Sequence, residues 1–132
     1  MITNSTIAFW LLEKLDLNQE LSFSDRKRLK AGEIESIAVD KIAQLKKEIL
    51  ATKFTGGIVW LALLIIGFHQ LAVGFGILDP ATTSLLSVRG EGILLILGVG
   101  AFGNMIRISK LEKKCIVFET ALEIDSLLAR ST

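Results

Sequence analysis

The hydrophobic pattern of the chain is dominated by an uncharged run from Phe54 to Leu78, which is rich in Trp, Leu, Ile, Val and Gly. As a helix, this run reaches about 37 Å at about 1.5 Å per residue, enough to cross a hydrocarbon core of about 30 Å with some tilt. A second apolar run, Gly92 to Ile106, makes about 22 Å of helix. The pattern therefore predicts an integral membrane protein with two transmembrane helices.

The second span needs more length than its apolar run gives, so its helix should begin before Gly92. Asp79 followed by Pro80 is a suitable helix start, because Asp caps the first turn and proline fits the first helical position. The glycines on either side of Glu91 could equally break such a helix. We expect spans at about 54–78 and 85–106, with an outer loop at about 79–91.

Both flanks of the predicted hairpin carry apolar residues at helical spacing. These residues are Ala38, Ile42, Leu45 and Ile49 before the first span, and Ile108, Leu111, Cys115, Phe118 and Leu122 after the second. Intervals of three and four are typical of the contact face of packed helices. Since the hairpin brings the two flanks together antiparallel, the spacing predicts an all-α fold in which the membrane hairpin extends into a cytoplasmic helical stalk with coiled-coil character.

The N-terminal segment has the pattern of a separate amphipathic helix. Its apolar stripe consists of Ile7, Trp10, Leu11 and Leu15. The opposite face mixes acids with a lysine, which favours packing on the stalk or on a partner over binding to anionic lipid. Ser22 and Asp25 fit a capping box that starts the next helix. We take Trp10, Leu11 and Ile42 as candidate contacts with a protein partner.

The Lys and Arg residues that flank the spans indicate the orientation, because basic residues are retained on the cytoplasmic side. The flanking basic residues are Lys46, Lys47 and Lys53 before the first span, Arg107, Lys110, Lys113 and Lys114 after the second, and only Arg89 in the outer loop. Both termini are therefore expected in the cytoplasm of a multi-pass cell-membrane protein. The chain then divides into cytoplasmic N-terminal helices (1–53), a transmembrane hairpin (54–106) and a cytoplasmic C-terminal helix (107–132).

Opposite charges nearly balance at each end of the chain. Residues 1–53 hold nine Lys and Arg against eight Asp and Glu, and residues 107–132 hold five against four. Neither end has the net positive field that nucleic-acid binding needs, so no nucleic acid is expected as a partner. The expected partners are the lipid bilayer and, on the cytoplasmic side, another protein or further copies of the chain.

Five polar residues in and beside the spans are candidates for function. His69 and Gln70 lie inside the first span, where they need polar partners; they form either a proton or ion site or hydrogen bonds between helices. Asp79, Arg89 and Glu91 are the charges on the outer side. They either mark the membrane boundary or, in a symmetric oligomer, form the mouth of a pore.

Glycines inside the spans suggest close helix contacts, because small residues let helix backbones approach in lipid. The candidate packing positions are Gly67, Gly74, Gly92, Gly100 and Gly103. These contacts could lie within the hairpin or between copies of the chain. The G-x-G-x-x-G spacing from Gly98 to Gly103 is not read as a dinucleotide site, since that chemistry requires a preceding strand and a soluble βαβ unit.

The residue inventory argues against an enzyme. The chain has one His, one Cys and no Tyr, and no set of His, Cys, Asp and Glu has metal-ligand spacing. We expect no catalytic residues, no cofactor and no metal. The leading hypothesis is a non-enzymatic assembly, anchoring or scaffold subunit that acts through its cytoplasmic helices. The alternative is a homo-oligomeric, ion-conducting or holin-like pore.

Overall fold

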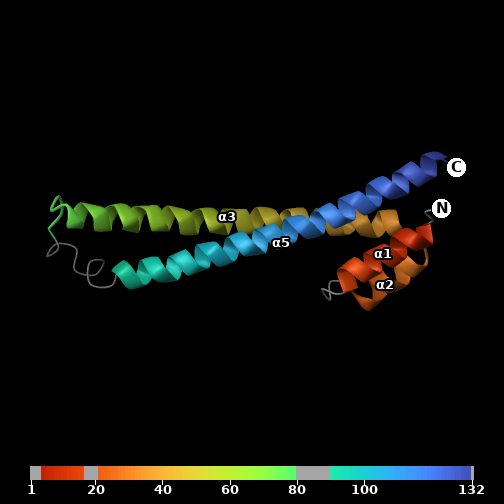
Figure 1. The fold of residues 1–132 in the computed structure, drawn as a ribbon, viewed down its shortest axis with the longest axis horizontal. Helices are drawn as coiled ribbons and strands as arrows, with labels where there is room; N and C mark the ends of the chain where they lie inside the picture. The colour runs from red at the N-terminus through yellow and green to blue at the C-terminus, as the bar shows by residue number, and fades with distance from the viewer. Residues whose placement is uncertain (1–3, 17–20, 80–89, 132) are drawn as a thin grey trace. The chain divides into compact units, whose positions relative to one another are not determined.

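The computed structural model describes residues 4–16, 21–79 and 90–131, which are 91% helical (Figure 1). The helices are α1 (Asn4–Asp16), α2 (Phe23–Lys30), α3 (Ile34–Gly74) and α5 (Gly90–Ser131). The two long helices, α3 and α5, pack against each other. The prediction of an all-α fold is confirmed for the described part of the chain.

The chain divides into two compact units, each containing parts of α3 and α5. Met1–Ile49 and Lys110–Thr132 form one, called here the core unit. Leu50–Ser109 form the other, called the apolar unit.

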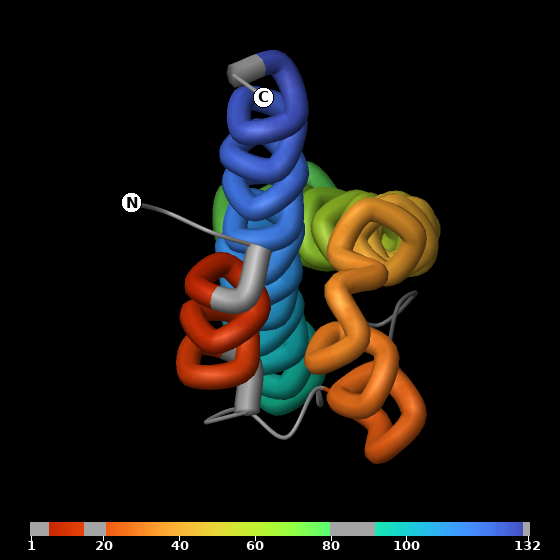
Figure 2. Tube along the Cα trace, turned by 90° about the vertical axis from the view of Figure 1, so that its right-hand side faces the viewer, coloured from red at the N-terminus to blue at the C-terminus, as the bar shows by residue number. Residues whose placement is uncertain are grey.

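The core unit has a hydrophobic core to which all four helices contribute. Its buried residues are Ile7, Ala8, Leu11, Leu21, Leu29, Ile34, Ile37, Ala38, Leu45, Leu111, Cys115, Phe118 and Ala121. Ile42, Ile49 and Leu122 are partly buried against them. The stripes predicted in the two flanks are therefore packing faces. Figure 2 shows α1 lying beside α5 in this unit.

Helix α2 begins at the capping box that the sequence predicts. The Ser22 hydroxyl accepts the Asp25 backbone N–H at 3.1 Å, and the Asp25 carboxylate accepts the Ser22 backbone N–H at 3.2 Å. Gly32 follows α2 at a φ of 88°, a left-handed conformation that glycine adopts without strain. An ion pair of 3.1 Å between Lys41 and Asp25 then ties α2 to α3.

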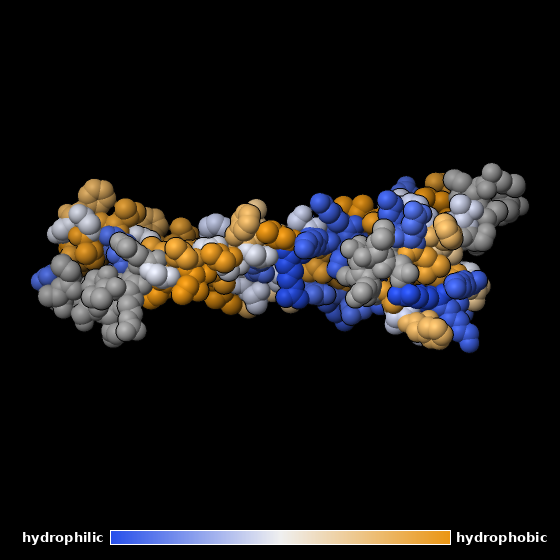
Figure 3. Space-filling model, turned by 60° about the horizontal axis from the view of Figure 1, so that its bottom comes forward, coloured by the Kyte–Doolittle hydropathy of each residue, from blue (hydrophilic) through white to orange (hydrophobic). Residues whose placement is uncertain are grey.

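The apolar unit continues the three-and-four spacing into the spans. The less exposed positions at this spacing are Thr52, Gly56, Val59, Leu63, Ile66, Gln70 and Val73 on α3, and Leu94, Leu97, Ala101, Asn104 and Ile108 on α5. The remaining faces are largely apolar and exposed, as the hydropathy colouring in Figure 3 shows for one side. In the most apolar stretches of the two helices, only 11% and 6% of the residues are buried.

Within the described residues, α3 and α5 are thus two helices long and apolar enough to cross a membrane. A core helix of a soluble protein would be mostly buried, whereas these helices leave large apolar side chains uncovered.

Helix α3 ends at Gly74, four residues before the predicted end of the first span. The Gly76 N–H bonds to the Val73 carbonyl at 3.0 Å, and the Ile77 N–H bonds to the Ala72 carbonyl at 2.9 Å. With Gly76 at a φ of 71°, this is the Schellman arrangement that closes a helix. The helix from Phe54 to Gly74 still measures about 31 Å. Helix α5 begins at Gly90, and the predicted start at 85 lies outside the described residues.

Candidate functional site

A polar contact centred on Asn104 of α5 joins the two helices of the apolar unit. The Asn104 Nδ2 donates to the carbonyl of Thr52 on α3 at 3.1 Å, and the Thr55 hydroxyl donates to the same carbonyl at 3.0 Å. Gly56 lies next to this bond, and a Cβ added there would stand 2.6 Å from Asn104 Nδ2. The absence of a side chain at Gly56 therefore makes room for the amide of Asn104.

The five glycines predicted as packing positions lie elsewhere. At Gly67, Gly74, Gly92, Gly100 and Gly103, a Cβ added to the backbone would have nothing within 4 Å. None of them is a point of close approach within the described chain, which leaves contact between copies as the remaining packing hypothesis. The sequence pattern did not indicate Gly56. The sequence signal that could have identified Gly56 is the apolar stripe of the cytoplasmic flank, because its three-and-four spacing continues from Ile49 through Thr52 to Gly56.

His69 and Gln70, the predicted intramembrane pair, lie in different surroundings. Both ring nitrogens of His69 are buried and have no hydrogen-bond partner among the described residues. Gln70 instead lines a hollow, together with Gly67, Leu71, Gly74, Phe75 and Leu94. Since His69 does not line this hollow, the structure does not join the two side chains in one site.

The three predicted outer charges are only partly placed. Asp79 follows the turn that ends α3, and Glu91 is the second residue of α5. Arg89 lies outside the described residues. A pore mouth built from these three charges remains a prediction.

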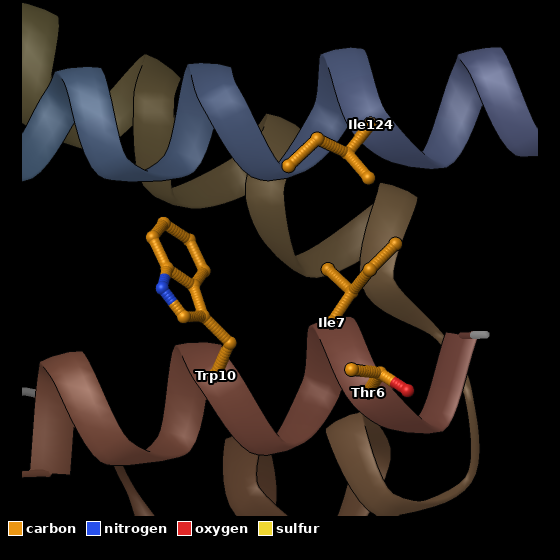
Figure 4. Close-up of a pocket in the computed structure, with 4 residues that line it drawn as sticks. All are labelled: Thr6, Ile7, Trp10 and Ile124. Carbon is orange, nitrogen blue, oxygen red and sulfur yellow. The ribbon is translucent and has the colours of Figure 1, made fainter. Parts of the chain in front are cut away.

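The candidate partner residues of the core unit do not form one surface. Leu11 is 0% exposed, so its side chain packs inside the chain's own core. Ile42 is partly buried against the same core. Trp10 lines an apolar cavity of about 180 Å³ with Thr6, Ile7 and Ile124. Figure 4 shows Trp10 and Ile7 pointing from α1 toward Ile124 on α5.

The single cysteine lies beside an ion pair that links the two long helices. Cys115 is 6% exposed, and its Sγ is 3.8 Å from Oε1 of Glu119. The same carboxylate oxygen is 2.9 Å from the Lys46 ammonium. Burial raises the pKa of the Cys115 thiol, and the negative charge of Glu119 acts in the same direction. The hydrogen bond from Lys46 lowers the pKa of Glu119.

Cys115 should therefore react slowly with a maleimide in the native protein. The thiolate is the reacting form, so a raised pKa and a buried sulfur both lower the rate. We expect fast labelling in denaturant and slow labelling in its absence, measured by mass spectrometry at neutral pH. Equal rates under the two conditions would show that the sulfur is accessible in the native protein.

No metal centre is formed by the residues that the structure describes: no three of their His, Cys, Asp and Glu side chains come together as ligands would. No protein-family model matches the sequence, and comparisons with curated proteins and with solved structures find no similar chain.

Proposed function

We propose that this chain is a two-span protein of the cell membrane, with both termini in the cytoplasm. The observation that supports it is the exposure of α3 and α5, whose most apolar stretches are only 11% and 6% buried. Each Å² of apolar surface left in water costs about 25 cal/mol, so surface of this extent favours a lipid environment. The basic residues flanking the spans support the proposed orientation.

Within this proposal, the core unit is a non-enzymatic anchoring or assembly module. It has its own hydrophobic core, the ion pairs Lys46–Glu119 and Arg28–Glu33 are exposed, and the Lys41–Asp25 pair is partly buried. Helices α3 and α5 each run from one unit into the other, which suits a module held at the membrane.

A cytoplasmic partner would bind an apolar surface of this module. Helix α1 presents Phe9, which is 70% exposed, and Trp10, which lines the cavity. Exposed aromatic side chains are typical of binding surfaces. Leu11 is excluded from this surface by its burial.

The proposed topology is tested with reporter fusions to the full chain. Reporters placed before Met1 and after Thr132 should stay cytoplasmic, and one inserted near Thr83 should be exported. As a control for the positive-inside effect, changing Lys46, Lys47 and Lys53 to Gln should weaken the orientation bias. An exported C-terminal reporter would overturn the two-span topology.

The pore alternative is separated from the anchor by ion flux. In a symmetric pore, rings of Asp79 and Glu91 would attract cations. Cation flux in liposomes that is abolished by Asp79→Asn with Glu91→Gln would favour the pore. Flux that is absent from the wild-type protein would favour the anchor.

A further inference from the structure

A cavity in the core unit lies between α1 and the C-terminal part of α5. Its volume is about 180 Å³, and Thr6, Ile7 and Trp10 line it from α1, with Ile124 on α5. Ile7 is 3% exposed and lies at the closed end, Trp10 and Ile124 are partly buried at the sides, and the exposed Thr6 marks the opening. Protein cores contain few voids larger than a water molecule, so a cavity of this size departs from ordinary packing.

The lining of the cavity selects against water and polar ligands. No polar atom of the described residues lines it. In Figure 4, the Thr6 hydroxyl and the Trp10 indole nitrogen point away from Ile124, whereas the six-membered ring of Trp10 reaches toward it. A buried water needs two to four polar partners, and a buried hydroxyl or amide without a partner is costly. The favoured occupant is therefore a hydrocarbon group.

The size of the cavity and the presence of Trp10 narrow the class of ligand further. An apolar cavity of about 150 Å³ takes up benzene, so a cavity of about 180 Å³ has room for one aromatic ring. Aromatic rings attract one another beyond the effect of the area they bury. Trp10 should therefore favour an aromatic occupant over an aliphatic one of similar size by about 2- to 12-fold in affinity.

We propose that this cavity is a binding site for a small neutral molecule with one aromatic ring. The ring inserts beside Trp10 and contacts Ile7 and Ile124, while any polar substituent stays at the opening by Thr6. All four lining residues belong to the core unit. The site therefore goes beyond the proposed anchoring role and does not depend on the membrane location of the chain.

The first test locates a probe, toluene, by nuclear magnetic resonance. The full chain carries ¹³C-labelled isoleucine δ1 methyl groups and is studied in perdeuterated detergent micelles. Ring protons of toluene should show nuclear Overhauser effects to Ile7 and Ile124. Ile37 is the matched control, because it is 1% exposed in the same core and does not line the cavity. The absence of an effect at Ile7, or equal effects at Ile7 and Ile37, would overturn the site.

The second test fills the cavity and measures what toluene then does to the core unit. A ligand at ten times its Kd lowers the population of the open state about tenfold, so maleimide labelling of Cys115 should slow by that factor in the wild type. Ile124→Trp should remove this effect, because its own indole occupies the cavity. Leu127→Trp on the same helix should keep it, since Leu127 is 57% exposed and lies outside the lining. Uptake of toluene by the micelles is common to all three proteins.

The response to toluene is compared within each variant, so a difference in basal stability does not enter the result. A toluene effect that persists in Ile124→Trp, or that is lost equally in Leu127→Trp, would contradict binding in this cavity. Methylcyclohexane tests the aromatic class, because it has the carbon skeleton of toluene without the aromatic ring. Its Kd should exceed that of toluene by about 2- to 12-fold. Equal Kd values would overturn the preference for an aromatic ligand.

Discussion

Replacing Phe118 with alanine is expected to destabilise the core unit by about 3–5 kcal/mol. Phe118 is 3% exposed and belongs to the core cluster with Leu111 and Cys115. Removing a buried aromatic ring loses its transfer free energy and leaves a cavity that neighbouring side chains fill only in part. A loss of this size is a large fraction of the stability of an ordinary domain.

The maleimide reaction of Cys115 measures the effect directly, because labelling requires the core unit to open. With a factor of ten for every ~1.4 kcal/mol, the native-state labelling rate should rise by roughly two to four powers of ten. The matched control is Ile116→Ala on the same helix, where the side chain is 58% exposed. This change should alter stability by no more than about 0.5 kcal/mol. Similar rates for the two variants would contradict the burial of Phe118.

The packing faces of the core unit could be predicted from the sequence because charged residues lie between the apolar ones. Along α3, charged residues lie between Ala38 and Ile42 and between Leu45 and Ile49, so only one face can be buried. The capping box at Ser22 was equally predictable, since two residue types at a fixed spacing satisfy the first backbone N–H groups of a helix.

The packing face inside the spans could not be found in this way. Nearly every residue there is apolar, so the contrast that marks a buried face on a soluble helix is lost. The sequence pattern pointed to five other glycines and not to Gly56, because composition alone does not say which small residue faces the other helix. In the structure, a Cβ at any of those five would have nothing within 4 Å. The end of α3 at Gly74 could not be predicted from the sequence for a related reason. Gly76 closes the helix by its backbone conformation, in a run that is apolar on both sides.

The partner residues required knowledge of the tertiary packing. The stripe with Trp10 and Leu11 shows that one face of α1 must be covered, and it does not show by what. In the structure, the chain's own core covers Leu11 and leaves Trp10 at a cavity. An amphipathic helix therefore predicts burial more securely than it predicts a binding partner.

Leucine should have opposite effects at the neighbouring glycines Gly56 and Gly57. At Gly56, a Cβ would stand 2.6 Å from Asn104 Nδ2, so a leucine must displace the amide from its bond to Thr52. Overpacking of this kind costs about 1–3 kcal/mol, and loss of the bond from Asn104 to Thr52 adds about 0.6–2 kcal/mol. At Gly57, nothing lies within 4 Å, so Gly57→Leu should stabilise the helix by up to about 1 kcal/mol.

The comparison is made by titrating the chain from mild detergent into SDS and following the fluorescence of Trp60, with Trp10→Phe removing the other tryptophan. The Gly56→Leu midpoint should fall well below that of the wild type, and the Gly57→Leu midpoint should equal or exceed it. A double-mutant cycle then isolates the contact: in an Asn104→Ala background, Gly56→Ala should no longer destabilise the protein and should gain up to about 1 kcal/mol of helix propensity, because the amide that it displaces is already absent. An equal cost of Gly56→Ala with and without Asn104 would show that the two residues do not meet, and that the helices pack along another face.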